Sequence, residues 1–217
     1  MTVAPRDLMV GGATVPIEFD YLTRHRSFAE LRSLAQETSK GHPRSTLVDE
    51  DLWRAFPRGY VGAWADDRLR GAIQLWPLDA RRAADFLVGA RPESELTADD
   101  FATICNSPSV VWYFSGLLVD PAWRGRGLAA HLFAEAMVRW HRDLPWRMPV
   151  HFAALGASPE GLSFIEAFGM QEVRPAGETA DGFPLFVRTF DGKAVMQDVV
   201  ESARAAADRK GRLVESA

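Results

Sequence analysis

The sequence predicts a mixed α/β fold in which helices flank a central β-sheet. Two short apolar runs within residues 60–76 are separated by a polar turn, a pattern typical of a β-hairpin. The nearly continuous apolar run 110–119 is rich in aromatic and β-branched residues, as in a strand covered on both faces. A glycine-rich loop follows it, and apolar residues then recur with the helical period over residues 128–140. Together these features indicate alternating strands and helices.

Size and composition favour one globular domain. The chain has 217 residues, of which 47% are hydrophobic and 25% are charged. We expect a single domain over 1–217, with its core at about 20–190 and a C-terminal helix and tail at 191–217. No apolar run approaches the ~20 residues of a membrane span, and the N-terminus lacks a secretory signal, so we expect no membrane partner. The default compartment is therefore the cytoplasm.

Charge and cysteine content exclude further classes. The formal net charge of −4 argues against a nucleic-acid partner, because such binding depends on neutralising phosphates. The single cysteine, Cys105, has no base or orienting group nearby in the sequence, so we interpret it as an ordinary thiol. No set of His, Cys and Asp residues shows the spacing of metal ligands, and we predict no metal.

Helical spacing in the first part of the chain starts at Phe28 and ends before Gly41-His42-Pro43. A second short helix is predicted over 47–56, where Pro57 and Gly59 end it. After the hairpin, residues 79–108 are mixed, with one expected helix near 81–88. This connection is long enough to be a functional lid.

The second part of the chain gives clearer signals. Gly116 interrupts the predicted central strand and marks a bulge or a close backbone approach. The amphipathic helix that follows carries a polar side, made of His131, Glu135, Arg139 and Arg142. A strand is predicted over 150–155, and a helix begins at Ser158 as N-cap and ends at Gly169. A last strand over 183–190 and a helix over 194–207 complete the prediction.

The loop between the central strand and the amphipathic helix carries the chemistry. A helix N-terminus has unpaired N–H groups and a partial positive charge, and glycines at 125 and 127 let a phosphate approach the backbone. A plain turn is one alternative. A dinucleotide site is another, because residues 125–130 read G-x-G-x-x-A, but residues 120–124 separate strand from glycine and no acidic residue follows the next strand.

The third interpretation is a family resemblance. Residues 124–129, Arg-Gly-Arg-Gly-Leu-Ala, fit R/Q-x-x-G-x-G/A, are preceded by LLVDPAW and lead into the amphipathic helix. This segment resembles the acyl-CoA signature of the GCN5-related N-acetyltransferase (GNAT) superfamily, and the order of elements is similar from about residue 60 to residue 190. The resemblance implies a GNAT-like mixed, splayed sheet flanked by helices, with a helical tail at the C-terminus.

The resemblance also implies the ligand and the residues that hold it. Acetyl-CoA, or another acyl-CoA, is the implied co-substrate. The strand end pairs with its pantetheine arm, the loop and first helical turn hold its pyrophosphate, and Ser158 flanks the arm. The implied cofactor-binding residues are Leu117, Leu118, Val119, Arg124, Gly125, Arg126, Gly127, Leu128, Ala129 and Ser158.

The family reaction is direct attack of an amine on the thioester in a ternary complex. It needs a donor for the oxyanion, which the backbone N–H near Leu118 could supply, and groups that move protons. The catalytic candidates are Tyr113, Ser115 and His151. The chain departs from the family pattern at Ile165, four residues before Gly169, where a tyrosine acid is common.

The expected function is therefore acyl-CoA-dependent N-acyltransfer, most simply of acetyl, to a small-molecule or peptide amine. A non-catalytic acyl-CoA-binding module and an N-acyl amino acid synthase-like enzyme with a longer donor are alternatives. The acceptor would meet residues 21–57, 79–108 and 174–186, and a homodimer is one expected assembly. Acids in the connection can hold a cationic amine, although such charges are usually solvated: Glu93, Glu95, Asp99 and Asp100.

Overall fold

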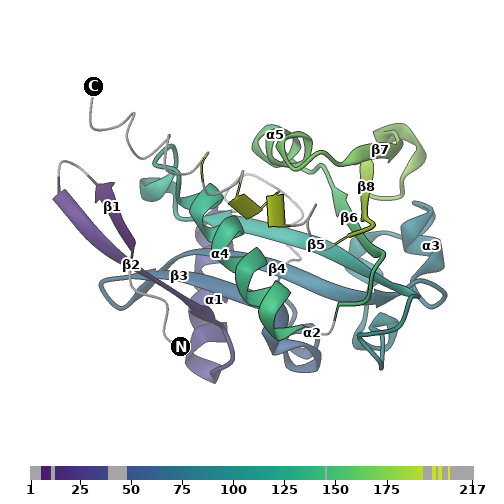
Figure 1. Ribbon diagram of the computed structural model, residues 1–217, viewed down its shortest axis with the longest axis horizontal. Helices are drawn as coiled ribbons and strands as arrows, with labels where there is room; N and C mark the ends of the chain where they lie inside the picture. Colours follow the sequence, from purple (N-terminus) through teal and green to yellow (C-terminus); the bar gives the residue numbers. More distant parts are fainter. Residues whose placement is uncertain are drawn as a thin grey trace. The chain divides into compact units, whose positions relative to one another are not determined.

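The computed structural model describes residues 6–10, 13–38, 48–144, 146–192, 197–198, 200–201 and 205. The strands are β1 (Arg6–Val10), β2 (Ala13–Tyr21), β3 (Tyr60–Ala65), β4 (Arg68–Asp79), β5 (Val110–Val119), β6 (Val150–Leu155), β7 (Gln171–Arg174) and β8 (Leu185–Phe190) (Figure 1). The helices are α1 (His25–Thr38), α2 (Glu50–Ala55), α3 (Ala84–Leu87), α4 (Leu128–Asp143) and α5 (Pro159–Ala167). The 3-10 turns are η1 (Pro57–Gly59), η2 (Glu93–Glu95), η3 (Ala98–Asp100), η4 (Pro121–Trp123) and η5 (Ala176–Glu178).

These elements confirm the mixed α/β class. The strands follow the order β1-β2-β3-β4-β5-β6-β8-β7. β5 and β6 run parallel, whereas β1–β2, β2–β3, β3–β4, β6–β8 and β8–β7 are antiparallel pairs. The predicted breaker at residues 41–43 lies outside the described residues. Of the predicted tail helix, the described residues 197–198, 200–201 and 205 are helical.

The chain divides into two compact units, each built from separate stretches of sequence. Unit 1 comprises Met1–Gln74, Gly116–Arg142 and Asp198–Ala217, and unit 2 comprises Leu75–Ser115 and Asp143–Gln197. Strands β4 and β5 each contribute residues to both units. In the part of the chain that the structure describes, no helix combines the length and the apolar character of a membrane span.

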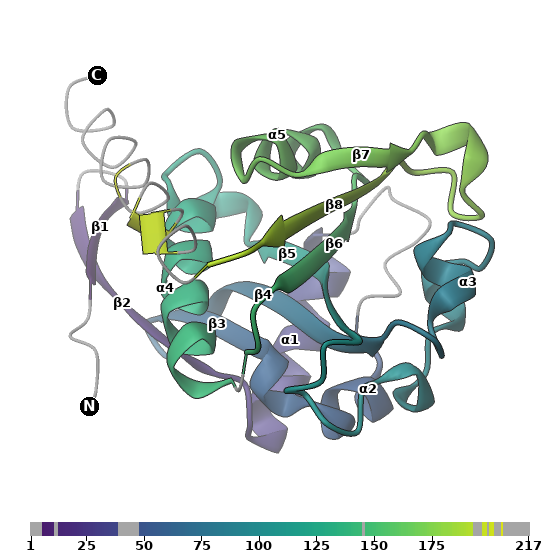
Figure 2. The ribbon, with the colours of Figure 1, turned by 45° about the vertical axis from the view of Figure 1, so that its right-hand side comes forward.

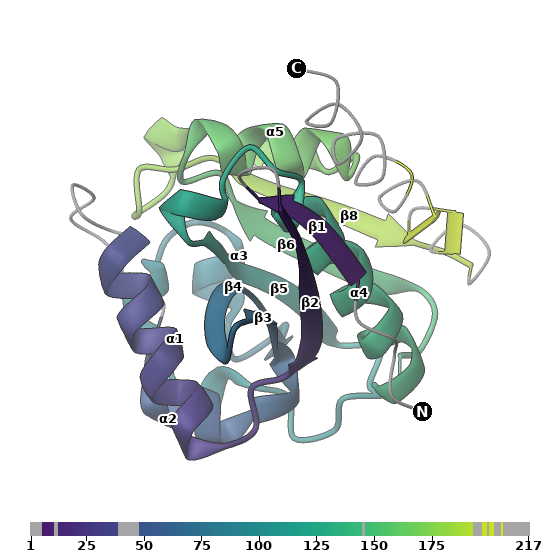
Figure 3. The same cartoon turned by 90° about the vertical axis from the view of Figure 1, so that its left-hand side faces the viewer.

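In unit 1, the predicted hairpin is β3–β4, and its turn is Asp66-Asp67. Both residues have positive φ, 50° and 57°, which matches the twist of a two-residue hairpin turn. On the other side of β3 lies β2, which the sequence analysis did not predict. The β1–β2 hairpin and α4 are both visible in Figure 3.

The polar side of α4 departs from expectation. His131, Glu135 and Arg139 are buried, and of the predicted polar residues only Arg142 is exposed. The Arg139 guanidinium donates to the carbonyl of Phe19 in β2 and lies 3.8 Å from the carboxylate of Asp20. The unpredicted strand β2 therefore reaches this side of the helix, so α4 is buried around most of its circumference.

In unit 2, strand β6 lies between β5 and β8, and Figure 2 shows α5 near β7 and β8. The Phe152 ring of β6 forms the centre of an aromatic cluster. It lies 5.2 Å from Phe114, 5.9 Å from Phe168 and 5.5 Å from Phe190 between ring centroids. This cluster joins three neighbouring strands to the end of α5, as expected for a strand covered by a helix.

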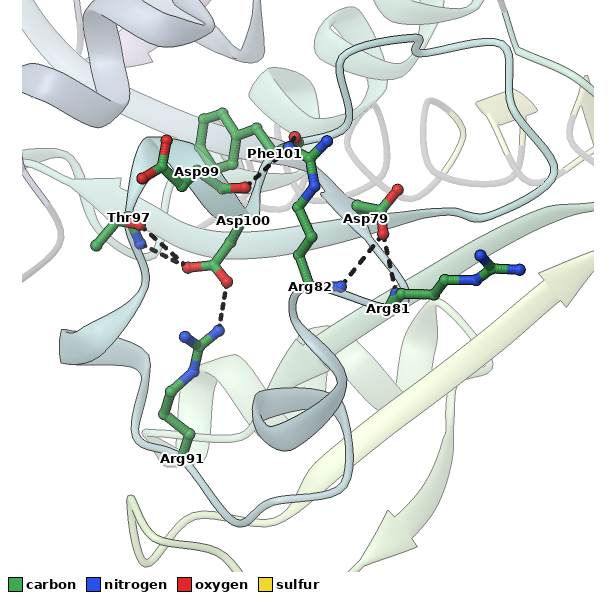
Figure 4. Close-up of polar contacts among 8 residues, drawn as sticks. All are labelled: Asp79, Arg81, Arg82, Arg91, Thr97, Asp99, Asp100 and Phe101. Carbon is green, nitrogen blue, oxygen red and sulfur yellow. Dashed lines mark hydrogen bonds and ion pairs between the residues drawn. The ribbon is translucent and has the colours of Figure 1, made fainter.

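Hydrogen bonds and an ion pair stabilise the connection between β4 and β5 (Figure 4). The carboxylate of Asp79 accepts from the N–H groups of Arg81 and Arg82, at 3.0 and 3.2 Å, where the chain turns into α3. The helix expected near 81–88 is thus α3. Farther along, Arg91 pairs with Asp100 at 2.6 Å, and the Asp100 side chain closes a capping box with Thr97.

Candidate active site

The loop that joins β5 to α4 presents a row of free backbone donors. The N–H groups of residues 125–129 donate to no protein atom within this described stretch. The first helical bonds run from the N–H groups of Ala130 and His131 to the carbonyl of Gly127. Five consecutive amide donors at the N-terminus of a 16-residue helix form an anion-binding arrangement.

The two glycines give the loop its shape. Gly125 and Gly127 have φ of +74° and +82°, a left-handed conformation that glycine adopts without a Cβ clash. A Cβ at Gly125 would meet no atom within 4 Å, so the space above this residue is open. Of the two glycines predicted to let a ligand approach the backbone, Gly125 is thus exposed, whereas Gly127 is buried.

Asp120 anchors the start of the loop. Its N–H donates to the carbonyl of Arg70 at 2.8 Å, and its carboxylate pairs with the Arg70 guanidinium at 3.0 Å. The other carboxylate oxygen accepts from the N–H of Ala122 at 2.9 Å and caps η4. The Arg70 guanidinium also lies over the Trp123 ring, 5.5 Å from its centroid. These contacts fix the base of the loop from both ends of η4.

Two arginines add positive charge to the loop. Arg124 is exposed and donates Nε to the carbonyl of Val119 at 3.3 Å. Arg126 is half-buried and donates Nε to the carbonyl of Ala122 at 3.1 Å. Both guanidinium groups are thus held against the backbone of the loop whose amides are free, which adds to the attraction for an anion.

The last residues of β5 are not paired by β6. In the described residues of these two strands, the parallel pairing runs from Val111 with His151 to Phe114 with Ala154 and ends there. β5 itself continues without a break through Gly116 to Val119. Leu117, Leu118 and Val119 therefore follow the point where the ladder to the neighbouring strand stops.

A cluster of titratable groups lies on one face of β5. Tyr113 and Ser115 are two residues apart and thus point to the same face. The Ser115 hydroxyl donates to the carboxylate of Glu93 at 2.9 Å, and the N–H of Glu93 donates to the carboxylate of Asp181 at 2.9 Å. The hydroxyl of Tyr113 is fully buried and has no partner at hydrogen-bonding geometry among the described residues. Its ring packs against Phe86, 4.8 Å away.

The cluster alters the proton affinities of its members. Burial of its carboxylate raises the pKa of Glu93 to about 7, and the charge of Asp181 contributes in the same direction. The hydrogen bond from Ser115 lowers the Glu93 pKa, and the nearby Tyr113 hydroxyl acts in the same direction, so the two groups offset part of this rise. Burial and the charge of Glu93 raise the pKa of Tyr113 well above its ordinary value. At neutral pH, Glu93 can therefore accept or release a proton, whereas Tyr113 stays protonated.

The structure leaves His151 apart from this cluster. His151 pairs with Val111 at the start of β6, and its Nδ1 lies 2.9 Å from the hydroxyl of Thr189 in β8. Ser115 is four residues beyond Val111, about 13 Å along an extended strand. Of the three sequence-based candidates, Tyr113 and Ser115 come together with Glu93, and His151 does not.

The remaining candidate residue, Ser158, caps α5 as expected. Its hydroxyl oxygen accepts from the N–H of Gly161 at 3.0 Å, and Pro159 occupies the first helical position. Ile165, at the position where the resemblance implies a tyrosine, is buried. Among the described residues, no group of three or more His, Cys, Asp and Glu side chains could hold a metal ion.

Glu93 is the residue that sequence reasoning did not assign. It appeared there only as one of several acids in the connection. Its partners Ser115 and Asp181 lie 22 and 88 residues away, so no local pattern reveals its environment. One signal in the sequence was the spacing of Ser115 and Tyr113, which places both hydroxyl groups on one face of the central strand. Two hydroxyl groups on a buried face need hydrogen-bond partners, and a buried acid is one such partner.

The architecture is shared with proteins of known structure. The GphF GNAT-like decarboxylase, solved with isobutyryl-CoA, is 16% identical, with a TM-score of 0.53 over 80% of this chain and 98% of that chain. The loading GNATL domain of CurA from Lyngbya majuscula is 12% identical, with a TM-score of 0.59 over 84% and 98%. A GNAT-family acetyltransferase from Desulfovibrio desulfuricans, described as putative, is 19% identical, with a TM-score of 0.51 over 81% and 98%.

At the level of sequence, no curated protein matches the chain. The sequence model of the acetyltransferase (GNAT) family matches residues 26–145, which is more than half of the chain. That range includes β5, the loop with the free amides and the whole of α4. The solved structures named above have the GNAT-like fold expected from the sequence. The chain therefore belongs to the GNAT acetyltransferase family.

Proposed function

We propose that the protein is an acyl-CoA-dependent N-acyltransferase, acting as one domain over 1–217. In this proposal it transfers acetyl from acetyl-CoA to the amine of a small molecule or peptide by direct attack in a ternary complex. The observation that carries the proposal is the row of free N–H groups at residues 125–129 at the start of α4.

This row suits the pyrophosphate of coenzyme A. Amide donors at a helix N-terminus bind phosphate oxygens, and the helix dipole favours their negative charge. Residues 125–129 supply the donors, and Arg124 and Arg126 supply positive charge at the same loop. The open space at Gly125 leaves room for phosphate oxygens near the backbone. A plain turn would need neither five free amides nor two arginines.

The end of β5 suits the pantetheine arm and the thioester. Because the ladder to β6 stops at Phe114, we propose that Leu117 and the N–H of Val119 pair with the amides of the arm, whereas the Val119 carbonyl accepts from Arg124. The N–H of Leu118 is the proposed donor to the oxyanion, and Ser158 at the start of α5 is proposed to flank the arm. For proton transfer we favour Tyr113 and Ser115 over His151, because they share the cluster with Glu93.

The test is release of free coenzyme A, measured with a thiol reagent, from acetyl-CoA and from longer acyl-CoA donors with a panel of amines. Release from acetyl-CoA that depends on an amine supports the proposal. Tight coenzyme A binding without turnover would instead support a non-catalytic binding module, which the buried Ile165 favours because it offers no acidic hydroxyl. Amine-dependent release only from long-chain donors would indicate the N-acyl amino acid synthase-like alternative.

A further inference from the structure

The connection between β4 and β5 brings an acid to the face of β5 that carries Tyr113 and Ser115. We propose that Glu93 accepts the proton of the attacking amine, and that Ser115 and Tyr113 are positioning residues for its carboxylate. This inference rests on the proposed acyl transfer and assigns its proton acceptor to η2, outside the central strand.

Glu93 is held by residues from two stretches that are distant in sequence. The Ser115 hydroxyl donates to one carboxylate oxygen at 2.9 Å, which leaves the second oxygen free of that bond. The backbone N–H of Glu93 donates to Asp181, in the stretch between η5 and β8. Because Ser115 holds the carboxylate and Asp181 holds the backbone of the same residue, the acid can meet a substrate nitrogen with little further ordering.

The hydroxyl of Tyr113 is a second group on this face of β5 that a substrate amine would meet. Buried hydroxyl groups almost always have a hydrogen-bond partner, and one that lacks a partner calls for an explanation. Tyr113 is fully buried, and among the described residues its hydroxyl meets no acceptor at full hydrogen-bonding geometry, although the nearby Glu93 carboxylate is the charged group that acts on it most strongly. An amine nitrogen brought to Glu93 would also come within reach of this hydroxyl and complete its hydrogen bonding.

The surroundings of Glu93 make its carboxylate a stronger base. The groups that act on Glu93 are Ser115 and Tyr113 from β5 and Asp181 from the stretch before β8. Asp181 contributes negative charge, while Arg91, two residues before Glu93, is paired with Asp100. A carboxylate with a pKa of about 7 is a stronger base than one with an ordinary pKa and is still about half ionised at neutral pH.

The ionised Glu93 carboxylate takes one proton from the alkylammonium group, which gives a neutral amine. The nitrogen then forms a bond to the thioester carbon and the bond from carbon to sulfur breaks. The second nitrogen proton neutralises the thiolate, so the products are an amide, the free thiol of coenzyme A and protonated Glu93, which returns its proton to water.

The experiment compares the wild type, Glu93→Gln and Glu95→Gln in the amine-dependent assay from pH 5.5 to 9. Glu95 is exposed and lies in the same 3-10 turn, so its variant controls for loss of one negative charge there. We expect kcat/KM of the wild type to rise with pH and level off above about 7. In Glu93→Gln, kcat/KM should fall about 100-fold or more and the inflection near pH 7 should disappear. In Glu95→Gln, both the value of kcat/KM and the inflection should stay as in the wild type.

Three further variants test the roles of the neighbours without removing the acid. Ser115→Ala and Tyr113→Phe should move the inflection to higher pH, because both hydroxyl groups lower the Glu93 pKa. Asp181→Asn should move it to lower pH, because it removes a negative charge and keeps an oxygen for the Glu93 N–H. A merely structural role would change the rate without moving the inflection in these opposite directions.

Calorimetric titration with coenzyme A distinguishes a failure of the Glu93 assignment from a failure of the proposed acyl transfer. Glu93→Gln should bind coenzyme A within about two-fold of the wild type, because the free amides lie in the loop before α4. A fully active Glu93→Gln enzyme with an unchanged pH profile would overturn the assignment of Glu93 and leave the proposed function standing. A wild type that neither binds coenzyme A nor transfers an acyl group would overturn both.

Discussion

At the scale of single residues, Asp120 shows how one carboxylate shapes the candidate site. One of its carboxylate oxygens pairs with the Arg70 guanidinium, and the other accepts from the N–H of Ala122. Because both partners of the ion pair are largely buried, the loss of one leaves the other with little access to water. The geometry of the loop that we propose to bind phosphate thus depends on a residue that the ligand need not touch.

We expect Asp120→Ala to lower the free energy of unfolding by about 2 kcal/mol, because it removes the cap of η4 and the partner of Arg70. Asp120→Asn keeps an oxygen for the cap and should lose less. Urea unfolding measures both effects, and coenzyme A affinity should fall in the same order. Equal stability of the two variants would contradict the separate roles of the two oxygens.

The acid–base property of Glu93 also affects stability. Its pKa in the folded chain, about 7, lies above the ordinary 4.5, so the folded state binds more protons between these values. Stability of the wild type should therefore fall as pH rises from about 5 to 8, on the order of 1–3 kcal/mol from this group. Glu93→Gln should remove this part of the dependence, which thermal unfolding at several pH values would show. A variant whose pH dependence equals that of the wild type would contradict the raised pKa.

At the scale of elements, the feature that most favours a bound ligand is the row of free N–H groups at the start of α4. We expect Gly125→Glu to weaken coenzyme A binding at least ten-fold, because it puts a negative charge beside the free amides. Gly125→Ala has the same backbone strain at φ of +74° and no charge, and its side chain would meet open space, so it is the matched control. Calorimetry should show a large loss of coenzyme A affinity for Gly125→Glu and a much smaller loss for Gly125→Ala. Equal affinities for the two variants would count against a phosphate at this loop.

Farther along α4, Arg139 joins the helix to β2. Arg139→Met should lower the free energy of unfolding by about 1–3 kcal/mol, because the carbonyl of Phe19 loses its buried donor. Arg142→Met, at an exposed position of the same helix, should change it by less than about 0.5 kcal/mol. Coenzyme A affinity should stay the same in both variants. A large loss of affinity in Arg139→Met would show that β2 acts on the loop.

The elements that the sequence predicts are those with a strong local pattern. The apolar run of β5, the period of α4 and the cap at Ser158 all correspond to the structure. β2 was missed although Ile17 and Phe19 alternate with exposed residues, because Pro16 and the polar flanks weaken the pattern. β7 was missed because its four residues are all exposed and carry no apolar alternation.

The candidate site divides in the same way. The loop at 124–129 could be predicted, because its glycines and arginines form a local motif before a helix. The cluster around Glu93 could not, because the burial that raises its pKa comes from residues that are distant in sequence. The buried polar side of α4 is a third case, since only the position of β2 shows that Arg139 is covered.

At the scale of the whole molecule, both compact units are assembled from separate stretches of the chain. Unit 2 begins at Leu75 and is interrupted by residues 116–142, which belong to unit 1. Its middle strand, β6, pairs with β8 only after Leu185 has been reached. No single cut in the sequence separates the two units, so neither can be expressed as one uninterrupted fragment.

This interleaving has a consequence for synthesis on the ribosome. Chains emerge from the amino end and commonly fold as they appear, but neither unit here is complete when its first stretch leaves the exit tunnel. The apolar side chains of β4 and β5 become buried only after later stretches of each unit have been translated. During translation the nascent polypeptide thus exposes apolar surface for a long interval, and a chaperone that binds such surface would protect it from aggregation.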